Sequence, residues 1–140
     1  MCSSDLPISG AGYQFNDGNA NEVKLSTQAA PQTATDTATL TVAQITGGIL
    51  QGSPTTTAAY TLPICVGTSS VTGMDSLNAH TNSAFDLYIN NVTGSGVVTM
   101  TAGTGWTVTG LATIAATANT SSHWRARKTS DTTWTLYRIG

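Results

Sequence analysis

Turn signals recur every eight to twelve residues along most of this chain, and the runs between them are too short for a long helix. Where a run has a period, the period is two: Phe85, Leu87 and Ile89 alternate with polar neighbours. Threonine, which favours strands, occurs 27 times in 140 residues, whereas only 9% of the residues are charged. Short strands joined by frequent turns are typical of sandwiches and barrels. We therefore predict an all-β fold, an antiparallel β-sandwich.

The small charge of the chain argues against two classes of partner. A net charge of −2 at pH 7 disfavours broad electrostatic capture of nucleic acid or of an acidic membrane surface. No run approaches the roughly 20 apolar residues that a membrane-spanning helix needs. We therefore expect no specific nucleic-acid partner and no membrane association.

The sequence predicts three consecutive parts. Residues 1–6 look like the translation of a sequencing-adapter end, so we expect a non-native leader there, with a lipoprotein-type start or an ordinary terminus as alternatives. Residues 7–37 lack a sustained period, and we expect an extended N-terminal arm, either a floppy leader or a segment that becomes ordered on a neighbour. Residues 38–140 then form the β-sandwich domain.

Three local patterns predict particular elements. Residues 43–46, followed by two glycines, predict one helical turn with a glycine exit. Residues 85–90 and 97–102 alternate and flank a glycine-bearing loop, which predicts a hairpin. Residues 67–82 are small and polar and predict a short helix or a long loop.

The final hairpin, within residues 122–139, permits a choice of register. A four-residue loop would place Arg127 opposite Trp134 and mix charge into the apolar face. A three-residue loop pairs Lys128 with Thr132 instead. We predict this second register because it alone separates the two faces. Its apolar face consists of Trp124, Ala126, Trp134 and Leu136.

Two groups of residues are candidates for contact with other molecules. Four of the five basic residues lie in the last 16 residues, either as a solvated strand face or as a contact surface for a neighbouring subunit or a capsid. The arm holds a few large apolar residues that have nothing local to pack against. The candidate interface residues are Tyr13, Phe15, Val23 and Leu25 in the arm and Arg125, Arg127, Lys128 and Arg138 in the hairpin.

Residues suited to catalysis are sparse, and we predict no enzymatic activity, no cofactor and no metal site. The carboxylates are not spaced to meet on one strand face, as glycoside hydrolysis requires. His80 and His123 have no Cys or Glu cluster nearby, which a zinc site would need. Cys65 lies in an apolar run and is expected in the core. Trp106 is expected to close the core, with a sugar-stacking platform as the alternative.

Short blocks follow one another in a fixed order from residue 39 to the C-terminus. They include Tyr60-Thr61-Leu62-Pro63, Phe85-Asp86-Leu87-Tyr88-Ile89-Asn90-Asn91, Thr101-Ala102-Gly103-Thr104-Gly105-Trp106, Trp124-Arg125-Ala126-Arg127 and Trp134-Thr135-Leu136-Tyr137-Arg138. In this order they resemble the β-sandwich domain of structural proteins of tailed bacteriophages, found in capsid decoration (cement) proteins and related virion appendages. The resemblance implies a jelly-roll-like sandwich, trimeric association and a place on the virion exterior.

The resemblance leads us to expect a non-enzymatic decoration protein that binds the outer shell and stabilises it through contacts between subunits. Its implied partners are the major capsid protein and further copies of itself, assembled in the host cytoplasm. One alternative is a receptor or glycan-binding domain of a tail appendage, with Trp106 or Tyr88 as stacking platforms. The other is a subunit of an extracellular filament whose arm adds a strand to the next subunit.

Overall fold

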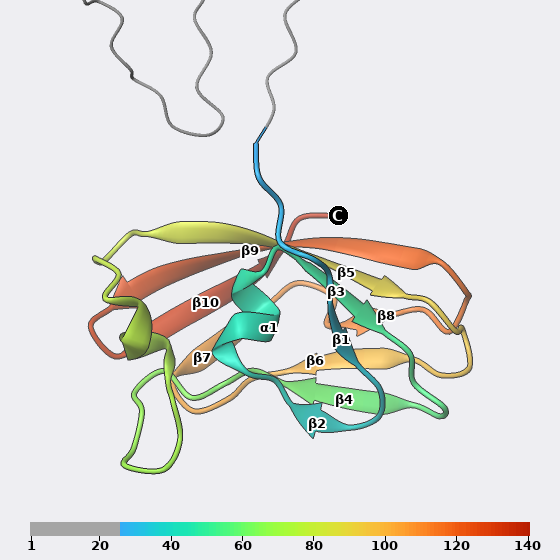
Figure 1. The fold of residues 1–140 in the computed structure, drawn as a ribbon, viewed down its shortest axis with the longest axis horizontal. Helices are drawn as coiled ribbons and strands as arrows, with labels where there is room; N and C mark the ends of the chain where they lie inside the picture. Colours follow the sequence, from blue (N-terminus) through green and yellow to red (C-terminus); the bar gives the residue numbers. More distant parts are fainter. Residues whose placement is uncertain (1–25) are drawn as a thin grey trace, which may run out of the picture.

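The computed structural model describes residues 26–140, which form two sheets lying one above the other (Figure 1). The order of the six-stranded sheet is β1 (Gln32–Ala34), β3 (Ile49–Gly52), β5 (Ala84–Asn91), β9 (Thr120–Ser130), β10 (Thr133–Arg138) and β7 (Trp106–Thr109). The order of the four-stranded sheet is β2 (Ala38–Thr39), β4 (Ala58–Thr61), β6 (Val98–Thr101) and β8 (Thr113–Ile114). The described chain also contains helix α1 (Val42–Thr46) and the 3₁₀ turn η2 (Met74–Leu77).

From β1 to β8, each strand is followed by a strand of the opposite sheet. The chain thus crosses from one sheet to the other after each strand, and after two crossings it is back in the first sheet and runs in its original direction. For this reason β1, β3 and β5 are parallel to one another, and so are β2, β4 and β6. Five of the eight strand pairings among the described residues are parallel and three are antiparallel. The prediction of a two-sheet, strand-rich fold is confirmed, but the prediction that it is antiparallel is wrong.

The same alternation overturns the hairpin predicted for residues 85–90 and 97–102. These residues form β5 and β6, which lie in different sheets. β5 pairs with β3 and β9, whereas β6 pairs with β4 and β8. A period of two reports only which side of a strand is buried and does not identify the partner strand, so the sequence pattern fits both arrangements.

The predicted helical turn is present as α1. Thr41 caps it, since its hydroxyl accepts from the Gln44 amide at 3.2 Å and the Gln44 side chain accepts from the Thr41 amide at 2.8 Å. Gly47 ends the helix, and Gly48 follows at φ +88°, a conformation that favours glycine. The helix buries Val42 and Ile45 and packs against β1, β3 and β5.

The core lies between the two sheets and takes its side chains from both. β5 contributes Leu87 and Ile89, and β4 and β6 contribute Tyr60 and Met100 from the opposite side. The largest side chain at full burial is Trp124 of β9. Predicted core residues Cys65 and Trp106 are also buried, and the indole Nε1 of Trp106 donates to the Pro63 carbonyl at 2.6 Å. Trp106 therefore closes the core and does not offer a sugar-stacking platform.

The last hairpin, β9 with β10, separates its two faces as predicted but uses a different pairing. Leu136 lies opposite Ala126 and Trp134 opposite Lys128, so the register is displaced by two residues from the predicted one. The turn is tighter than expected, because Ser130 and Thr133 pair and a bulge follows. A displacement of two keeps every side chain on its own face, so the buried set is unchanged.

A polar side chain at the end of β5 connects two loops inside the fold, the loop between β5 and β6 and the loop between β8 and β9. Asn91 is fully buried, and its amide nitrogen donates to the carbonyls of Gly96 at 2.7 Å and Ala115 at 3.0 Å. Its side-chain oxygen accepts from the Gly94 amide at 3.2 Å. Both amide hydrogens and the side-chain oxygen thus have partners, which is what allows a polar group to be buried at this depth.

Part of the range predicted as an arm belongs to the sheets. Gln32–Ala34 forms β1, at one edge of the six-stranded sheet and parallel to β3. The hydroxyl of buried Tyr60 lies 2.9 Å from the carbonyl oxygens of both Ala34 and Thr35, which ties the start of the domain to β4. Burial raises the pKa of Tyr60 to about 12, so this hydroxyl remains protonated at ordinary pH.

Candidate functional site

The outer face of the six-stranded sheet carries the polar side chains of its two middle strands. Successive residues of a strand point to opposite sides, so burial of Leu87 and Trp124 turns their neighbours outward. In the antiparallel pairing of β5 with β9, Asp86 lies directly opposite Arg125, and Tyr88 directly opposite His123. These four residues form what we call the outer-face cluster.

The charges of the outer-face cluster form a two-point ion pair. Arg125 Nε donates to Asp86 Oδ1 at 2.7 Å, and Arg125 Nη2 donates to Oδ2 at 3.0 Å. The hydrogen bonds from Arg125 lower the pKa of Asp86, and those to Asp86 raise the pKa of Arg125. The ion pair holds Asp86 of β5 and Arg125 of β9 in place across the two strands. Their opposite charges balance each other locally.

The aromatic half of the cluster is a stacked pair. The rings of Tyr88 and His123 lie 4.4 Å apart between centroids and are nearly parallel, at 9°. Tyr88 is 45% exposed, so one side of the stack faces solvent. His123 Nε2 lies 3.5 Å from Asp86 Oδ1 and is buried without a hydrogen-bond partner. The stack and the ion pair thus fix four side chains side by side on the outer face of β5 and β9.

The structure does not gather the four predicted basic residues on one surface. Arg127 shares the outward side of β9 with Arg125 and donates to the Asn82 side-chain oxygen. Lys128 is half-buried, and its Nζ donates to the Ala79 carbonyl at 2.6 Å, next to η2. Lys128 and the fourth basic residue, Arg138, both have even numbers. Even-numbered residues of the hairpin lie on the side that carries its buried aromatic residues.

Arg138 is the second cation on that inward side. Its guanidinium carbon lies 5.0 Å from the ring centroid of buried Trp124, and its Nη1 donates to the Thr113 carbonyl at 2.9 Å. Lys128 and Arg138 therefore serve local packing, while Arg125 and Arg127 face outward. The predicted arm residues Tyr13, Phe15, Val23 and Leu25 lie outside the residues that the structure describes.

The pairing with Arg125 predicts how acid affects stability. The pKa of Asp86 is lower folded than unfolded, so its carboxylate stabilises the fold above about pH 4, and this contribution is lost as pH falls through the folded pKa. We expect Asp86→Asn to lower the urea midpoint slightly at pH 7, because Arg125 is 56% exposed and the pair is screened by water. The difference between the two urea midpoints should shrink as pH falls below about 4. Equal midpoints at pH 7, or a gap that persists in acid, would contradict this assignment.

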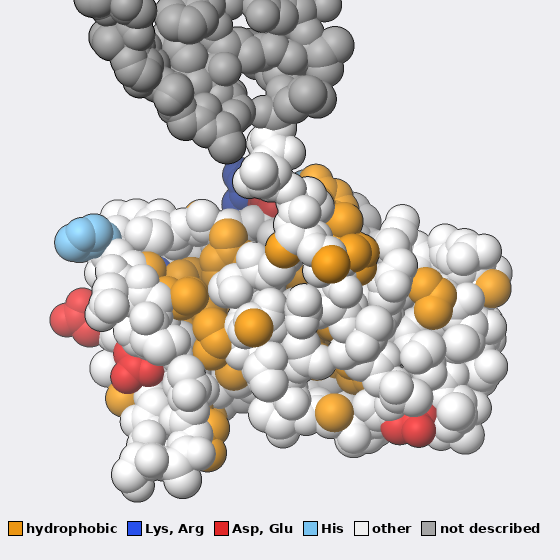
Figure 2. Space-filling model, viewed as in Figure 1, with side chains coloured by type: hydrophobic (Ala, Val, Ile, Leu, Met, Phe, Trp, Pro, Cys, Tyr) orange, Lys and Arg blue, Asp and Glu red, His pale blue; other side chains and the backbone are white. Residues whose placement is uncertain are grey.

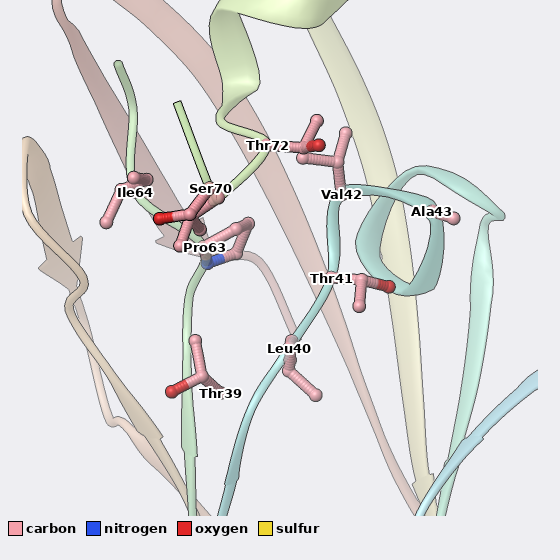
Figure 3. Close-up of a pocket in the computed structure, with 10 residues that line it drawn as sticks. Thr39, Leu40, Thr41, Val42, Ala43, Pro63, Ile64, Ser70 and Thr72 are labelled. Carbon is pink, nitrogen blue, oxygen red and sulfur yellow. The ribbon is translucent and has the colours of Figure 1, made fainter. Parts of the chain in front are cut away.

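Besides the outer-face cluster, the structure contains a second candidate site, an apolar pocket of about 490 Å³ beside the first turn of α1. No sequence pattern indicated this pocket. One wall comes from residues 39–43 and the other from Pro63, Ile64 and residues 70–72 (Figure 3). All ten lining residues are uncharged. Figure 2 shows hydrophobic side chains at the surface between α1 and the loop that precedes η2. The walls are 20 to 33 positions apart in sequence, so no local period could indicate that they meet.

Groups with reactive chemistry are few in the part of the chain that the structure covers. Among residues 26–140, no three His, Cys, Asp or Glu side chains are grouped as a metal site would require. Burial raises the pKa of the Cys65 thiol to about 11, so it stays protonated at neutral pH. No helix among these residues is long and apolar enough to cross a membrane.

Comparison with known proteins adds no assignment. No family model matches the chain, and neither a curated protein nor a solved structure matches it. The outer-face cluster and the apolar pocket are therefore the two features from which a function can be inferred.

Proposed function

We propose that the protein is a non-enzymatic structural protein of a tailed-bacteriophage virion, a capsid decoration protein that binds the outer shell as a homo-oligomer, with a trimer as the expected form. The observation that carries the proposal is the outer-face cluster, a sheet surface on which the Asp86 and Arg125 charges are already paired and Tyr88 is 45% exposed. The ordered blocks from residue 39 onward, which resemble those of decoration proteins, supply the class of assembly.

Two properties of the cluster suit protein contact. Tyrosine and arginine are enriched at the centres of protein interfaces, and here Tyr88 and Arg125 stand on adjacent strands. Binding also immobilises side chains, which costs entropy, and the pairing with Asp86 holds Arg125 in place before any partner arrives. A partner would therefore meet a surface that is already ordered and nearly neutral.

The proposal includes several finer statements. The major capsid protein is the partner on the shell, and the virion exterior is the location after assembly in the host cytoplasm. A jelly-roll-like sandwich belongs to the same proposal, with the parallel ladders β1-β3-β5 and β2-β4-β6 as a departure of this chain from that form. Repeated contacts around a closed oligomer would reinforce a shell without chemistry.

The test is the amount of protein in virions of the phage that encodes it. We expect copies in proportion to the major capsid protein, counted by quantitative mass spectrometry. Capsids stripped of the protein should rebind the wild type. Tyr88→Glu should reduce rebinding at least tenfold, because it buries a carboxylate in the interface. Thr99→Glu, which places the same group on the outward side of β6 in the other sheet, should rebind normally. Absence from virions, or full rebinding of the Tyr88 variant, would refute the proposal.

The exposed Tyr88–His123 stack also favours a second candidate, a glycan-binding domain of a tail appendage. Sugar rings pack on flat aromatic surfaces, and Tyr88 leaves one such surface open. That role predicts a few copies per virion and binding to host cell-surface glycans that Tyr88→Ala abolishes. The copy number separates the two candidates directly.

A further inference from the structure

The proposed function does not use the apolar pocket beside α1. Its volume, about 490 Å³, lies within the range of sites that hold small ligands or single large side chains. The floor is built from buried Leu40, Val42 and Pro63, and Val71 on the rim is 50% exposed. Such a concentration of uncharged side chains around an open hollow selects an apolar, uncharged occupant.

The position of the pocket suits an extended segment. It begins at Thr39 in β2, which is an edge strand of the four-stranded sheet. The amide of the next residue, Leu40, already pairs with the Thr61 carbonyl of β4 at 2.8 Å, so β2 is held on its inner side and its other side is the sheet edge. A peptide running past this edge would have the pocket directly beside it.

The chain itself contains a segment with the required chemistry. Twenty-five residues precede the described part, and they include two aromatic residues, Tyr13 and Phe15. Residues two apart fall on the same side of an extended segment, so both rings could face one surface. The ring of Phe15 is wholly apolar and suits the floor, while the hydroxyl of Tyr13 would meet the hydroxyl side chains of the rim, such as Ser70 and Thr72.

The distance is also within reach. The described chain begins next to α1, where the Gln28 side chain donates to the Gly47 carbonyl at 2.6 Å, at the end of the helix. The pocket lies at the start of the same five-residue helix, a rise of roughly 8 Å away. Phe15 and Gln28 are thirteen positions apart, which is roughly 40 Å of extended chain. The N-terminal segment can therefore cover the pocket of its own chain or of a second copy.

We propose that the apolar pocket formed by residues 39–43, 63–64 and 70–72 is the binding site for the chain's own N-terminal segment, with Phe15 inserted in the floor and Tyr13 at the rim. This assignment goes beyond the virion role and does not depend on it. Binding there would cover the half-exposed Val71 and replace water on the apolar walls by an aromatic ring.

The test is photo-cross-linking in the purified full-length chain, with benzoylphenylalanine in place of Phe15. Mass spectrometry of the digested product should locate the cross-links within residues 39–43 or 63–72. Preparing equal amounts of isotopically heavy and light chains together shows whether a link joins one chain or two. Cross-links from position 15 to the pocket support the assignment, whether they lie within one chain or join two chains. Links elsewhere, or none, overturn it.

Two matched valine variants sharpen the result. Val71→Glu places a carboxylate at the rim and should reduce pocket links at least tenfold. Val66→Glu alters a valine of similar exposure, 47% against 50%, on the same loop but outside the pocket lining, and should leave the yield unchanged. Thermal melts of both variants check that they fold equally. Equal yields from the two would overturn the assignment, and because no capsid is present, the outcome is independent of the virion test.

Discussion

Trp124→Ala is expected to lower the free energy of unfolding by about 3–5 kcal/mol, the largest loss from truncating any single side chain of this protein. Trp124 is fully buried in β9, one of the two middle strands of the six-stranded sheet. Its indole Nε1 donates to the buried Ser122 hydroxyl at 2.7 Å, and Arg138 lies over its ring. Removing the ring leaves a cavity, removes the hydrogen bond that the indole donates to Ser122 and removes the contact of the Arg138 guanidinium with the ring.

Urea unfolding followed by circular dichroism measures this loss. Tyr88→Ala is the matched control, because it removes a ring from the outward side of the neighbouring strand, where Tyr88 is 45% exposed. The control should cost less than about 1 kcal/mol, since little buried apolar area is lost. A similar cost for both variants would show that Trp124 does not have the central packing role assigned to it.

Gly96→Ala is expected to destabilise the protein by about 3 kcal/mol or more, although it adds a single methyl group. A Cβ at this position would lie 2.2 Å from the carbonyl carbon and oxygen of Thr56 and 2.5 Å from the Thr57 amide nitrogen. All three are backbone atoms, so no side-chain rotation can make room. The carbonyl of Gly96 also accepts from buried Asn91, so a local shift would break that hydrogen bond as well.

The control is Gly140→Ala, because a Cβ there meets nothing within 4 Å. Melting temperatures of the two variants, measured side by side, should differ by many degrees. If Gly96→Ala and Gly140→Ala have the same melting temperature, then the loops at Thr56 and Gly96 do not approach each other as closely as described.

Periodicity along the chain predicted the sides of the strands better than their partners. The faces of β9 and β10 follow from alternation because hydrophobic burial acts on each strand separately. The parallel ladders could not be foreseen, since pairing depends on where the chain crosses between sheets. The hairpin pairing differs from the predicted one by two residues because the tight turn pairs Ser130 with Thr133 and a bulge follows, and the alternation records neither.

For the candidate sites too, alternation predicted which side of a strand a residue lies on but not which residues it contacts. Arg125 and Arg127 lie outward as alternation requires, and the partner of Arg125, Asp86, became evident only when β5 was placed beside β9. Lys128 and Arg138 carry charge on the inward side, where their long stems reach backbone carbonyls. The apolar pocket depends on segments that are adjacent only in three dimensions.

The place of β9 in the sheet has a consequence for synthesis of the protein. β9 separates β5 from β10, so the six-stranded sheet lacks its middle until residue 130 has been made, and β10 ends at Arg138, two residues before the C-terminus. A ribosome shields the most recently made residues in its exit tunnel, so the sheet closes only once β9 and β10 have left the tunnel. Chains truncated before β9 would therefore leave β5 as an unpaired edge of the sheet, and a cell would degrade or aggregate them rather than accumulate a shortened domain.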